Sequence, residues 1–275
     1  MLIDTHAHLN FSAFKNDLDK VIRRTLENSI WVVNVGSQYS TSKRAVEIAE
    51  EYEKGIFAAV GLHPIHTEER KVDSAEVDSQ LVFTTRSEEF NYEEYKNLAQ
   101  SKKVVAIGEI GLDYYYKPKT KKKLEVFKQR QKDIFLEQVR LAKELDLPLI
   151  LHCRMANEDL LGLLNKGRGV MHCFSGSLEQ ARKYLELGFY IGLNGLIFKN
   201  VEGLPDPTEV INEVPLERIL VETDAPYLTP PDIEEKRNEP LNVCYVAKKI
   251  AEVKNISYEE IADITTKNAR ELFRI

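Results

Sequence analysis

The sequence predicts an α/β fold of the (β/α)8, or TIM, barrel class, slightly distorted and with an insertion after its third strand. Two observations carry this prediction. Short apolar runs, several of them rich in Val and Ile throughout, alternate with amphipathic stretches of helical period, as expected for parallel strands covered on both faces. Eight such runs fit within 275 residues, a usual length for this barrel. An open, doubly wound sheet is the alternative, but the sequence lacks the Gly-rich phosphate-binding motif that would favour it.

The expected strands and helices follow one another along the chain as a single domain over residues 1–275. The eight strands are expected at residues 2–5, 31–35, 56–60, 104–107, 149–151, 169–171, 190–193 and 219–221. The clearest helical patterns lie at residues 18–28, 41–52, 123–145, 157–165, 178–187 and 243–253. Ser177 and Ser257 each stand three residues before a Gln or Glu, which is the pattern of a capping box. Gly55 and Gly188 are expected where helices end.

Residues 67–91 break this alternation with a polar, acidic stretch between the third strand and a short helix expected near residues 92–101. The segment at residues 80–85, Gln-Leu-Val-Phe-Thr-Thr, fits a small strand within the stretch. Two interpretations stay open. One is a surface loop, since long insertions often lack fixed structure, and the other is a flap at the barrel mouth that contacts the substrate.

Composition and charge are ordinary for a globular enzyme and do not indicate a general nucleic-acid-binding surface. The net charge is −6, yet two bound divalent cations would offset most of it, so a locally positive site is possible. No apolar run approaches the ~20 residues that span a bilayer, and the N-terminus does not resemble a signal peptide, so we expect no membrane partner. Three cysteines are too few for a disulfide scaffold, so we expect a cytoplasmic location. We expect no obligate protein partner.

Histidines and acids gather at the carboxyl ends of the expected strands. In a (β/α)8 barrel these ends meet at one face, where active sites are built. The positions concerned are His6, His8, His63, Glu109, His152, His172 and Asp224. Imidazoles and carboxylates are ligands of divalent metals, so we expect a metal centre at the barrel mouth.

Two pairs of these polar residues have the two-residue spacing that puts strand side chains on one side. His6 and His8 are one such pair and suit a shared metal. Glu222 and Asp224 are the other, and we expect Asp224 to reach the mouth while Glu222 lies deeper as a supporting acid. Buried carboxylates repel one another unless a cation or donor compensates, which favours a metal near Asp224.

Two cysteines directly follow expected metal ligands. Alternation along a strand turns Cys153 and Cys173 toward the helix layer, where we expect both to be buried as small hydrophobic residues. A disulfide between them is geometrically conceivable, but a reducing cytoplasm disfavours it. Among the histidines, His66 is expected to be exposed to solvent.

Further side chains near the mouth are candidates for substrate contact. Arg154 lies two residues beyond His152 on the same side, and its planar guanidinium suits a phosphate oxygen, with a surface salt bridge as the alternative. His63 is expected to hydrogen-bond a phosphate or a metal ligand rather than to bind a metal itself. Arg237 and Asn238 follow the last strand, where they either contact the substrate or cap and close a loop.

Residues 114–123 place five Lys directly behind three Tyr. Lysines at the start of the helix that follows are opposed by the helix dipole, so helix stability does not explain them. Contact with a phosphate backbone would explain the lysines, and base stacking would explain tyrosines such as Tyr115. The alternative is a solvated charged face.

Seven segments resemble the signatures of TatD-type metal-dependent deoxyribonucleases and occur in that family's order. They are Asp4-Thr5-His6-Ala7-His8-Leu9, Gly61-Leu62-His63-Pro64, Gly108-Glu109-Ile110-Gly111-Leu112-Asp113-Tyr114-Tyr115, Leu151-His152-Cys153-Arg154, His172-Cys173-Phe174-Ser175-Gly176, Glu222-Thr223-Asp224-Ala225-Pro226 and Arg237-Asn238-Glu239-Pro240. The resemblance therefore covers nearly the whole chain. The insertion at residues 67–91 is longer than usual for the family, which bears on the substrate and not on the metal site.

The resemblance implies a TIM-barrel hydrolase of phosphodiesters with two divalent metal ions. It implies one ion held by His6, His8 and Asp224, a second held by His152 and His172, and Glu109 as the bridge. Zn, Mg, Mn and Ni all suit such a site. The implied substrate is DNA, as single strands or 3′ ends, and the implied activity is that of a 3′–5′ exonuclease-like deoxyribonuclease in DNA repair or turnover.

This ligand set predicts how the reaction proceeds. A bridging Glu109 would set the metal spacing needed to activate water and clamp a phosphodiester, and Asp224 would accept the proton of that water. Both residues are therefore expected to be catalytic. Ligand histidines must be neutral, so activity is expected to fall as the pH drops through roughly 6.

Two other functions stay open. An amidohydrolase acting on a small amide, lactone or ester also begins with a His-x-His pair, but it typically bridges its metals with a carboxylated Lys where this sequence has Glu109. Lys102 and Lys103 lie at the wrong end of that strand. A non-catalytic adaptor would use its metal for structure only, in a closed site of four ligands that usually include Cys. Six ligand positions without Cys favour an open, catalytic site.

Overall fold

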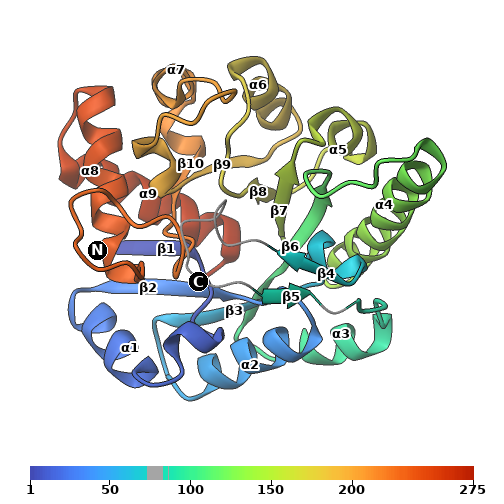
Figure 1. Cartoon of the computed structure of the whole chain (residues 1–275). Coiled ribbons are helices and arrows are strands. Elements are labelled where there is room, and N and C mark those ends of the chain that lie inside the picture. Colours follow the sequence, from blue (N-terminus) through green and yellow to red (C-terminus); the bar gives the residue numbers. More distant parts are fainter. Residues whose placement is uncertain (73–82, 86) are drawn as a thin grey trace.

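The computed structural model describes residues 1–72, 83–85 and 87–275 of the chain. Its centre is a parallel sheet with the strand order β1-β2-β3-β6-β7-β8-β9-β10, curled into a nearly closed barrel (Figure 1). The strands of the barrel are β1 (Leu2–Ala7), β2 (Ile30–Val35), β3 (Ile56–Val60), β6 (Val104–Asp113), β7 (Leu149–Arg154), β8 (Gly169–Met171), β9 (Tyr190–Leu193) and β10 (Ile219–Val221). The predicted TIM-barrel class is confirmed.

Helices alternate with these strands and surround the barrel (Figure 1). The α-helices are α1 (Leu18–Glu27), α2 (Tyr39–Glu50), α3 (Tyr92–Leu98), α4 (Lys121–Glu144), α5 (Asn157–Leu163), α6 (Leu178–Glu186), α7 (Pro207–Glu213), α8 (Val243–Lys254) and α9 (Tyr258–Phe273). Short 3-10 helices are η1 (Ser12–Phe14), η2 (Pro64–Thr67), η4 (Gly195–Phe198), η5 (Leu216–Arg218) and η6 (Pro240–Asn242). Among the described residues, no helix has both the length and the apolar character needed to cross a membrane.

The predicted insertion lies between β3 and β6. It follows η2 and precedes α3, and it contains a separate two-stranded antiparallel sheet of β4 (Arg70–Val72) and β5 (Phe83–Thr85). The strand expected at residues 80–85 therefore exists at residues 83–85, while residues 80–82 lie outside the described part of the chain.

The barrel closes between β1 and β10, and we call this junction the seam. Unlike the other neighbouring strands, these two are not paired along a continuous register. In the described structure, one isolated parallel bridge, between Ala7 and Ala225, connects the two sides. The His8 amide donates to the Ala225 carbonyl at 2.7 Å, and the Asp224 amide donates to the His6 carbonyl at 2.8 Å. The seam thus runs through three of the predicted metal ligands.

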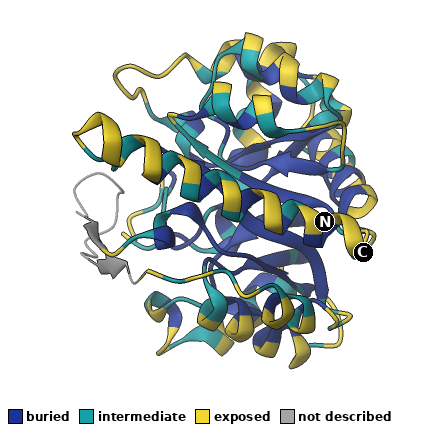
Figure 2. Cartoon of the chain, turned by 90° about the vertical axis from the view of Figure 1, so that its right-hand side faces the viewer, coloured by how far each residue is buried: buried dark blue, intermediate teal, exposed yellow. Residues whose placement is uncertain are grey.

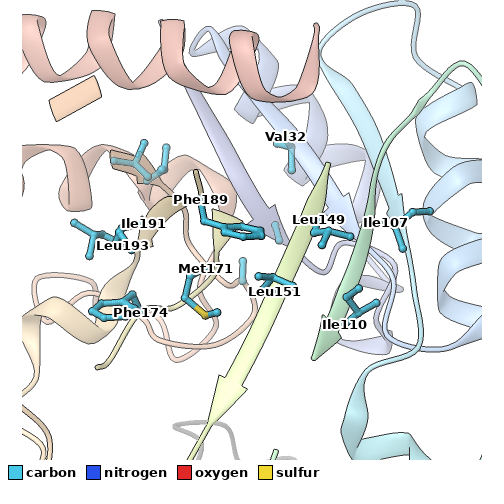
Figure 3. Close-up of a cluster of buried hydrophobic side chains, with 14 of the residues drawn as sticks. Val32, Ile107, Ile110, Leu149, Leu151, Met171, Phe174, Phe189, Ile191 and Leu193 are labelled. Atoms are coloured by element: carbon cyan, nitrogen blue, oxygen red, sulfur yellow. The ribbon is translucent and has the colours of Figure 1, made fainter. Parts of the chain in front are cut away.

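Two buried clusters fill the molecule, and Figure 2 shows how burial concentrates in the strands while exposed residues lie on the outer helices. The larger cluster packs the sheet against the helices, and Figure 3 shows part of it, with Leu151 of β7 beside Met171 of β8. The smaller cluster includes Ile150 and Val170. Because strand side chains alternate, these two point to the same side as His152 and His172, into the barrel.

The opposite end of the barrel is covered by the last helix. Leu272 and Phe273 of α9 belong to the inner cluster, and Trp31 and Phe57, at the beginnings of β2 and β3, pack against it. Strand beginnings lie away from the histidines, so α9 seals the end of the barrel opposite the predicted site. The first residue of the chain also contacts this helix, because Thr266 Oγ1 donates to the Met1 carbonyl at 3.0 Å.

The eight strand positions are confirmed, and the helix predictions need four corrections. The short helix α7 was not predicted, and α9 was predicted only through its start at Ser257. Ser257 accepts from the Glu260 amide, whereas the full capping box forms at Ser177. Gly188 directly follows the α6 C-cap with φ +96°. Gly55 is not the end of a helix, since α2 ends five residues before it, at Glu50, with Glu51 as the C-cap.

Candidate metal centre

Seven polar side chains from six strands meet at the mouth of the barrel. They are His6, His8, His63, Glu109, His152, His172 and Asp224. Three overlapping groups of their nitrogen and oxygen atoms are each compact enough to hold a metal ion, with all atoms of a group within 4.8 Å of one another. The structure therefore brings together every residue that the sequence predicts as a metal ligand.

One part of the centre lies at the seam. His6 Nε2 and His8 Nε2 are 3.2 Å apart, and both face the same carboxylates. Asp224 Oδ1 lies 3.3 Å from His8 Nε2 and 3.8 Å from His6 Nε2. Glu109 Oε2 lies 3.4 Å from His6 Nε2. Two imidazoles and two carboxylates thus surround one small space.

The other oxygen of Glu109 faces a different set of side chains. Glu109 Oε1 lies 2.8 Å from His152 Nδ1 and 3.3 Å from His63 Nε2. His172 stands between the two parts, with its Nε2 3.8 Å from Glu109 Oε1 and 3.8 Å from Asp224 Oδ1. One carboxylate thereby spans both parts of the centre, which is the arrangement a bridging ligand requires.

Polar contacts fix which nitrogen of three histidines faces inward. His8 Nδ1 lies 2.9 Å from the Val35 carbonyl, so it carries the proton of a neutral ring and leaves the Nε2 lone pair facing the centre. His172 Nδ1 lies at an ion-pair distance of 2.8 Å from Glu222 Oε1, and its Nε2 faces the centre. His63 is the opposite case, because its Nδ1 accepts from the Ile65 amide at 3.0 Å. A neutral His63 must then carry its proton on Nε2, where it donates to Glu109.

Burial and charge act on the titratable groups in opposite directions. Burial lowers the pKa of His6 and of His63, so both favour the neutral ring that ligation or a single donated proton requires. Burial would raise the pKa of Glu109, but the neighbouring His63 and hydrogen bonds from His152 and His6 outweigh burial and hold that pKa well below its usual value. Asp224 is likewise kept ionised, against burial, by His172 and His8, which lower its pKa.

The donor set fits divalent metal ions. Imidazole nitrogens and carboxylate oxygens are what such ions bind, and thiols contribute nothing to the three groups. The Nε2 atoms of His6 and His8 also turn toward each other within a buried space that holds two carboxylates. A cation would compensate these acids, which would otherwise repel one another.

Comparison with known proteins decides the family. The model of the family described as TatD related DNase matches residues 3–274. The chain belongs to this family. It is 43% identical to an uncharacterized metal-dependent hydrolase, YabD of Bacillus subtilis, over 100% of both chains. It is 31% identical to the 3′-5′ ssDNA/RNA exonuclease TatD of Pantoea ananatis, over 99% of both. The crystal structure of YJJV, a TatD homologue from Escherichia coli, covers 100% of this chain and 98% of its own with a TM-score of 0.82 at 29% identity. This TatD-family chain is therefore a metal-dependent hydrolase.

Glu222 supports the centre of this TatD-family barrel from below. Its side chain is 1% exposed, against 16% for Asp224, so it lies deeper, as expected from the sequence. Its Oε1 accepts from the Cys173 amide at 2.7 Å and from Asn194 Nδ2 at 3.2 Å. A Cβ at Gly192 would lie 2.7 Å from Glu222 Oε2, so a residue without a side chain is needed to admit this carboxylate.

Two further acids of the TatD-family motifs, whose roles the sequence did not predict, support the metal centre. Asp113 places Oδ2 3.3 Å from His152 Nε2, so a neutral His152 that donates to it keeps Nδ1 free for the centre. Asp4 is completely buried and accepts from the Thr223 amide at 2.9 Å and from Thr223 Oγ1 at 2.6 Å. Asp4 thus ties β1 across the seam to the residue before Asp224.

Helix α4 fixes two loops of the mouth through buried glutamines. Gln138 accepts from the Leu62 amide at 2.7 Å and donates to the Leu62 carbonyl at 3.0 Å. Gln131 forms the same pair of bonds with the backbone of Asp113, at 2.9 and 3.0 Å. These bonds position the residue before His63 and the end of β6.

The predicted substrate residues divide into two groups. His63 lies in the centre, and Arg154 stacks on Tyr115 at its edge, with Cζ 3.5 Å from the ring centre. Arg237 instead forms ion pairs with Asp17 and Glu239, both at 2.7 Å. Asn238 is 1% exposed and donates to the Thr223 and Tyr227 carbonyls. These contacts close the loop around Asp224, which was the alternative role considered for both residues.

Three remaining expectations concern His66 and the cysteines. His66 was expected to be exposed, but it is 7% exposed, because η2 folds it inward and its carbonyl accepts from the Glu88 amide. Cys153 and Cys173 are free thiols, partly rather than fully buried. Burial raises the pKa of Cys153 to about 12 and holds the pKa of Cys173 well above its usual value. Both thiols are therefore poor nucleophiles.

Proposed function

We propose that this TatD-family hydrolase cleaves phosphodiester bonds of nucleic acid, as a deoxyribonuclease with 3′–5′ exonuclease-like action in DNA repair or turnover. The observation that carries the proposal is Glu109, whose two oxygens face different sets of histidines at the mouth of the barrel. Two-metal centres joined by a carboxylate suit phosphodiesters, because they clamp both the attacking and the leaving oxygen. The name of the Pantoea ananatis relative adds support for single-stranded substrates.

The proposed centre holds two divalent ions, with Zn, Mg, Mn and Ni as candidates. One ion would be held by His6, His8 and Asp224. The other ion would be held by His152 and His172, and Glu109 would bind both ions. When bound, the ions would lower the pKa of a water and offset the charge of the phosphate. His63 would not be a ligand, since its Nδ1 accepts from Ile65 and its Nε2 proton points to Glu109.

Asp224 is the proposed acceptor of the water's proton. Its side chain is 16% exposed, the largest value among the acids of the centre, against 6% for Glu109 and 5% for Asp113. Its pKa is lowered, against burial, by His172 and His8, so it is ionised at neutral pH. Its backbone has φ +57°, a left-handed conformation that Asp tolerates better than most residues. The backbone on both sides of Asp224 is held by hydrogen bonds, because Asn238 donates to the Thr223 and Tyr227 carbonyls.

Two residues are proposed to position Glu109 and the phosphate. His63 donates to Glu109 Oε1 and so orients the carboxylate without competing for a metal. Arg154 is partly exposed, two residues beyond His152 on β7, and its planar edge suits a non-bridging phosphate oxygen. A cytoplasmic location stays a prediction from the cysteine content.

Hydrolysis of defined substrates by the metal-loaded protein tests this function. We expect release of 3′-terminal nucleotides from single-stranded DNA, and we expect Asp224→Asn to lower kcat by roughly a hundredfold or more because the proton acceptor is lost. Lys267→Gln, on the exposed side of α9, is the matched control and should retain activity. Cleavage of a lactone or amide panel, with DNA left intact, would instead favour the amidohydrolase function. Cleavage of neither class would favour the adaptor.

A further inference from the structure

Arg154, the last residue of β7, and Tyr115, two residues after the end of β6, form a stacked pair at the edge of the centre. The guanidinium Cζ lies 3.5 Å from the Tyr115 ring centre, which is the separation of two stacked planes. The Tyr116 ring packs against the Tyr115 ring in an edge-to-face arrangement, with their ring centres 4.9 Å apart. The backbone fixes the pair as well, because β6 and β7 pair Asp113 with Arg154, and the Tyr114 amide donates to the Arg154 carbonyl at 2.9 Å.

The stacked pair is anchored to the metal centre through Asp113. Asp113 Oδ1 accepts from the Tyr115 amide at 2.9 Å, while Oδ2 of the same carboxylate lies 3.3 Å from His152 Nε2. Asp113 itself is 5% exposed and is held on its backbone by Gln131 of α4. The pair therefore sits at a fixed place relative to one of the proposed metal ligands.

Arg154 keeps its hydrogen-bonding edge available. Stacking uses the face of a guanidinium and leaves its N–H donors in the plane. Within the described part of the chain, no carboxylate lies within ion-pair distance of Arg154, although other arginines at the rim, such as Arg237 and Arg24, are paired with acids. An Arg that is oriented by a ring and not neutralised by an acid suits an anionic ligand.

Five lysines extend this positive surface away from the stacked pair. They are Lys117, Lys119, Lys121, Lys122 and Lys123, all exposed, and no acid occurs between residues 114 and 124. Among the described residues none of the five has an ion-pair partner, and no acidic side chain occupies the first turn of α4. The helix dipole disfavours lysines at this end, so the cluster costs stability that a bound polyanion would restore.

We propose that Tyr115, Arg154 and these lysines form a subsite for single-stranded nucleic acid, with the nucleotide nearest the metal centre stacked on the pair. The base rests on the aromatic and guanidinium platform, the Arg154 edge binds the adjoining phosphate, and the lysines follow the rest of the strand. The subsite rests on the proposed function, since it presents the strand to that centre. Its ligand is a flexible strand because only unpaired bases can stack on a side chain.

Oligonucleotides with and without one base test the platform. The probe is a fluorescent, phosphorothioate-linked single strand bound to the metal-loaded protein, compared with the same strand carrying an abasic nucleotide at its 3′ end. Tyr115→Ala should weaken binding of the complete strand roughly tenfold but bind the abasic strand about as wild type does. Tyr115→Phe keeps the ring and should bind both strands as wild type does. Equal losses for both strands in Tyr115→Ala would overturn base stacking on this pair.

A charge-matched comparison tests the lysines. The triple variant Lys121→Gln, Lys122→Gln and Lys123→Gln should reduce the slope of log K against log salt by about two. The control triple, Lys54→Gln, Lys102→Gln and Lys166→Gln, removes the same charge from exposed positions just before β3, β6 and β8, at the far end of the barrel. The control should keep the wild-type slope. Equal slopes in both triples would contradict the proposed path of the strand.

Hydrolysis of bis(p-nitrophenyl) phosphate by the wild-type protein distinguishes a failure of the proposed function from a failure of the proposed subsite. If the wild type hydrolyses this small diester but neither binds nor cleaves oligonucleotides, nucleic acid is the wrong substrate and the subsite falls with it. If the wild type cleaves oligonucleotides while the Tyr115 and lysine variants bind like their controls, the proposed function stands and the subsite alone is refuted.

Discussion

At the scale of single residues, the centre depends on which imidazole nitrogen faces inward. Val35 and Glu222 hold the Nδ1 atoms of His8 and His172, so Nε2 is left for a metal. Ile65 does the reverse to His63, whose Nδ1 accepts its amide. A sequence gives the positions of the histidines but not these partners, which explains why the role of His63 needed the structure.

Two raised pKa values predict that metal binding releases protons. Burial opposes protonation of His152, but Asp113 and Glu109 outweigh it and raise its pKa to about 9. Burial opposes protonation of His172 too, but Glu222 and Asp224 raise its pKa to about 10. Both rings are therefore charged at neutral pH without metal, whereas ligands must be neutral. Calorimetric titration in buffers of different ionisation enthalpy should detect close to two protons released per chain, and a value near zero would contradict these assignments.

The same shifts give the sign of the pH dependence of stability in the metal-free chain. Raised histidine pKa values contribute stability below about pH 6.5 that is lost as the pH rises through 9 to 10. Glu109 and Asp224 have lowered pKa values, so their contribution is lost in acid. Melting temperatures of metal-free protein should therefore peak near roughly pH 6.5 and fall toward pH 10. A melting temperature that climbs steadily across that alkaline range would contradict the shifts.

The supporting residues that the sequence did not predict are those whose hydrogen-bond partners lie far away along the chain or beyond the predicted end of a strand. The predicted ligands follow from strand ends and two-residue spacing, which are local signals. Asp4 gains its role only through Thr223, 219 residues away, once the barrel closes. Asp113 lies past the predicted end of its strand, because β6 continues to residue 113 and carries Glu109 within it.

At the scale of elements, β6 and α4 together shape the mouth. The buried stripe of α4 contains Gln131 and Gln138 among apolar residues such as Phe127 and Phe135. A polar residue on such a stripe must find hydrogen-bond partners, and these two bind the backbone of the mouth loops. The helix therefore does more than cover the sheet, since it also sets the positions of Leu62 and Asp113.

Gln138→Leu tests this role of α4. The substitution leaves the buried amide and carbonyl of Leu62 without partners, so we expect a loss of about 2 kcal/mol in the free energy of unfolding. Gln129→Leu, on the exposed side of the same helix, is the control and should change that free energy by about 0.5 kcal/mol or less. Urea denaturation of both variants measures the difference. Equal stabilities would show that the Leu62 bonds contribute little.

Helices and strands were predicted correctly where their hydrophobic pattern is long or continuous, and they were missed where that pattern is short. The buried strands stand out because they are apolar throughout. Helix α7 spans Pro207–Glu213, too short for a clear period, although Asp206 before a Pro is a recognisable start signal and its side chain does accept from the Thr208 amide. Gly55 has φ +85° but serves the turn into β3 and not a helix end.

At the scale of the whole molecule, the barrel topology brings the residues of the metal centre together. Parallel strands bring their carboxyl ends to one mouth, while α9 seals the other end. The site lies at the seam, where β1 and β10 meet through one isolated bridge and the side-chain bonds of Asp4. The sequence predicted this convergence from strand order alone, whereas the seam could not be foreseen, because it depends on how far β1 and β10 overlap. That residues 1–275 form one domain stays a prediction.

The number of divalent ions bound per chain tests the central claim most directly. Elemental analysis of protein loaded with Zn²⁺ or Mn²⁺ and then desalted should give two ions for the wild type, two for His63→Gln and fewer than two for Glu109→Gln, because the two oxygens of Glu109 face the two parts of the centre. One ion in the wild type, or two in Glu109→Gln, would contradict a two-metal centre bridged by this carboxylate.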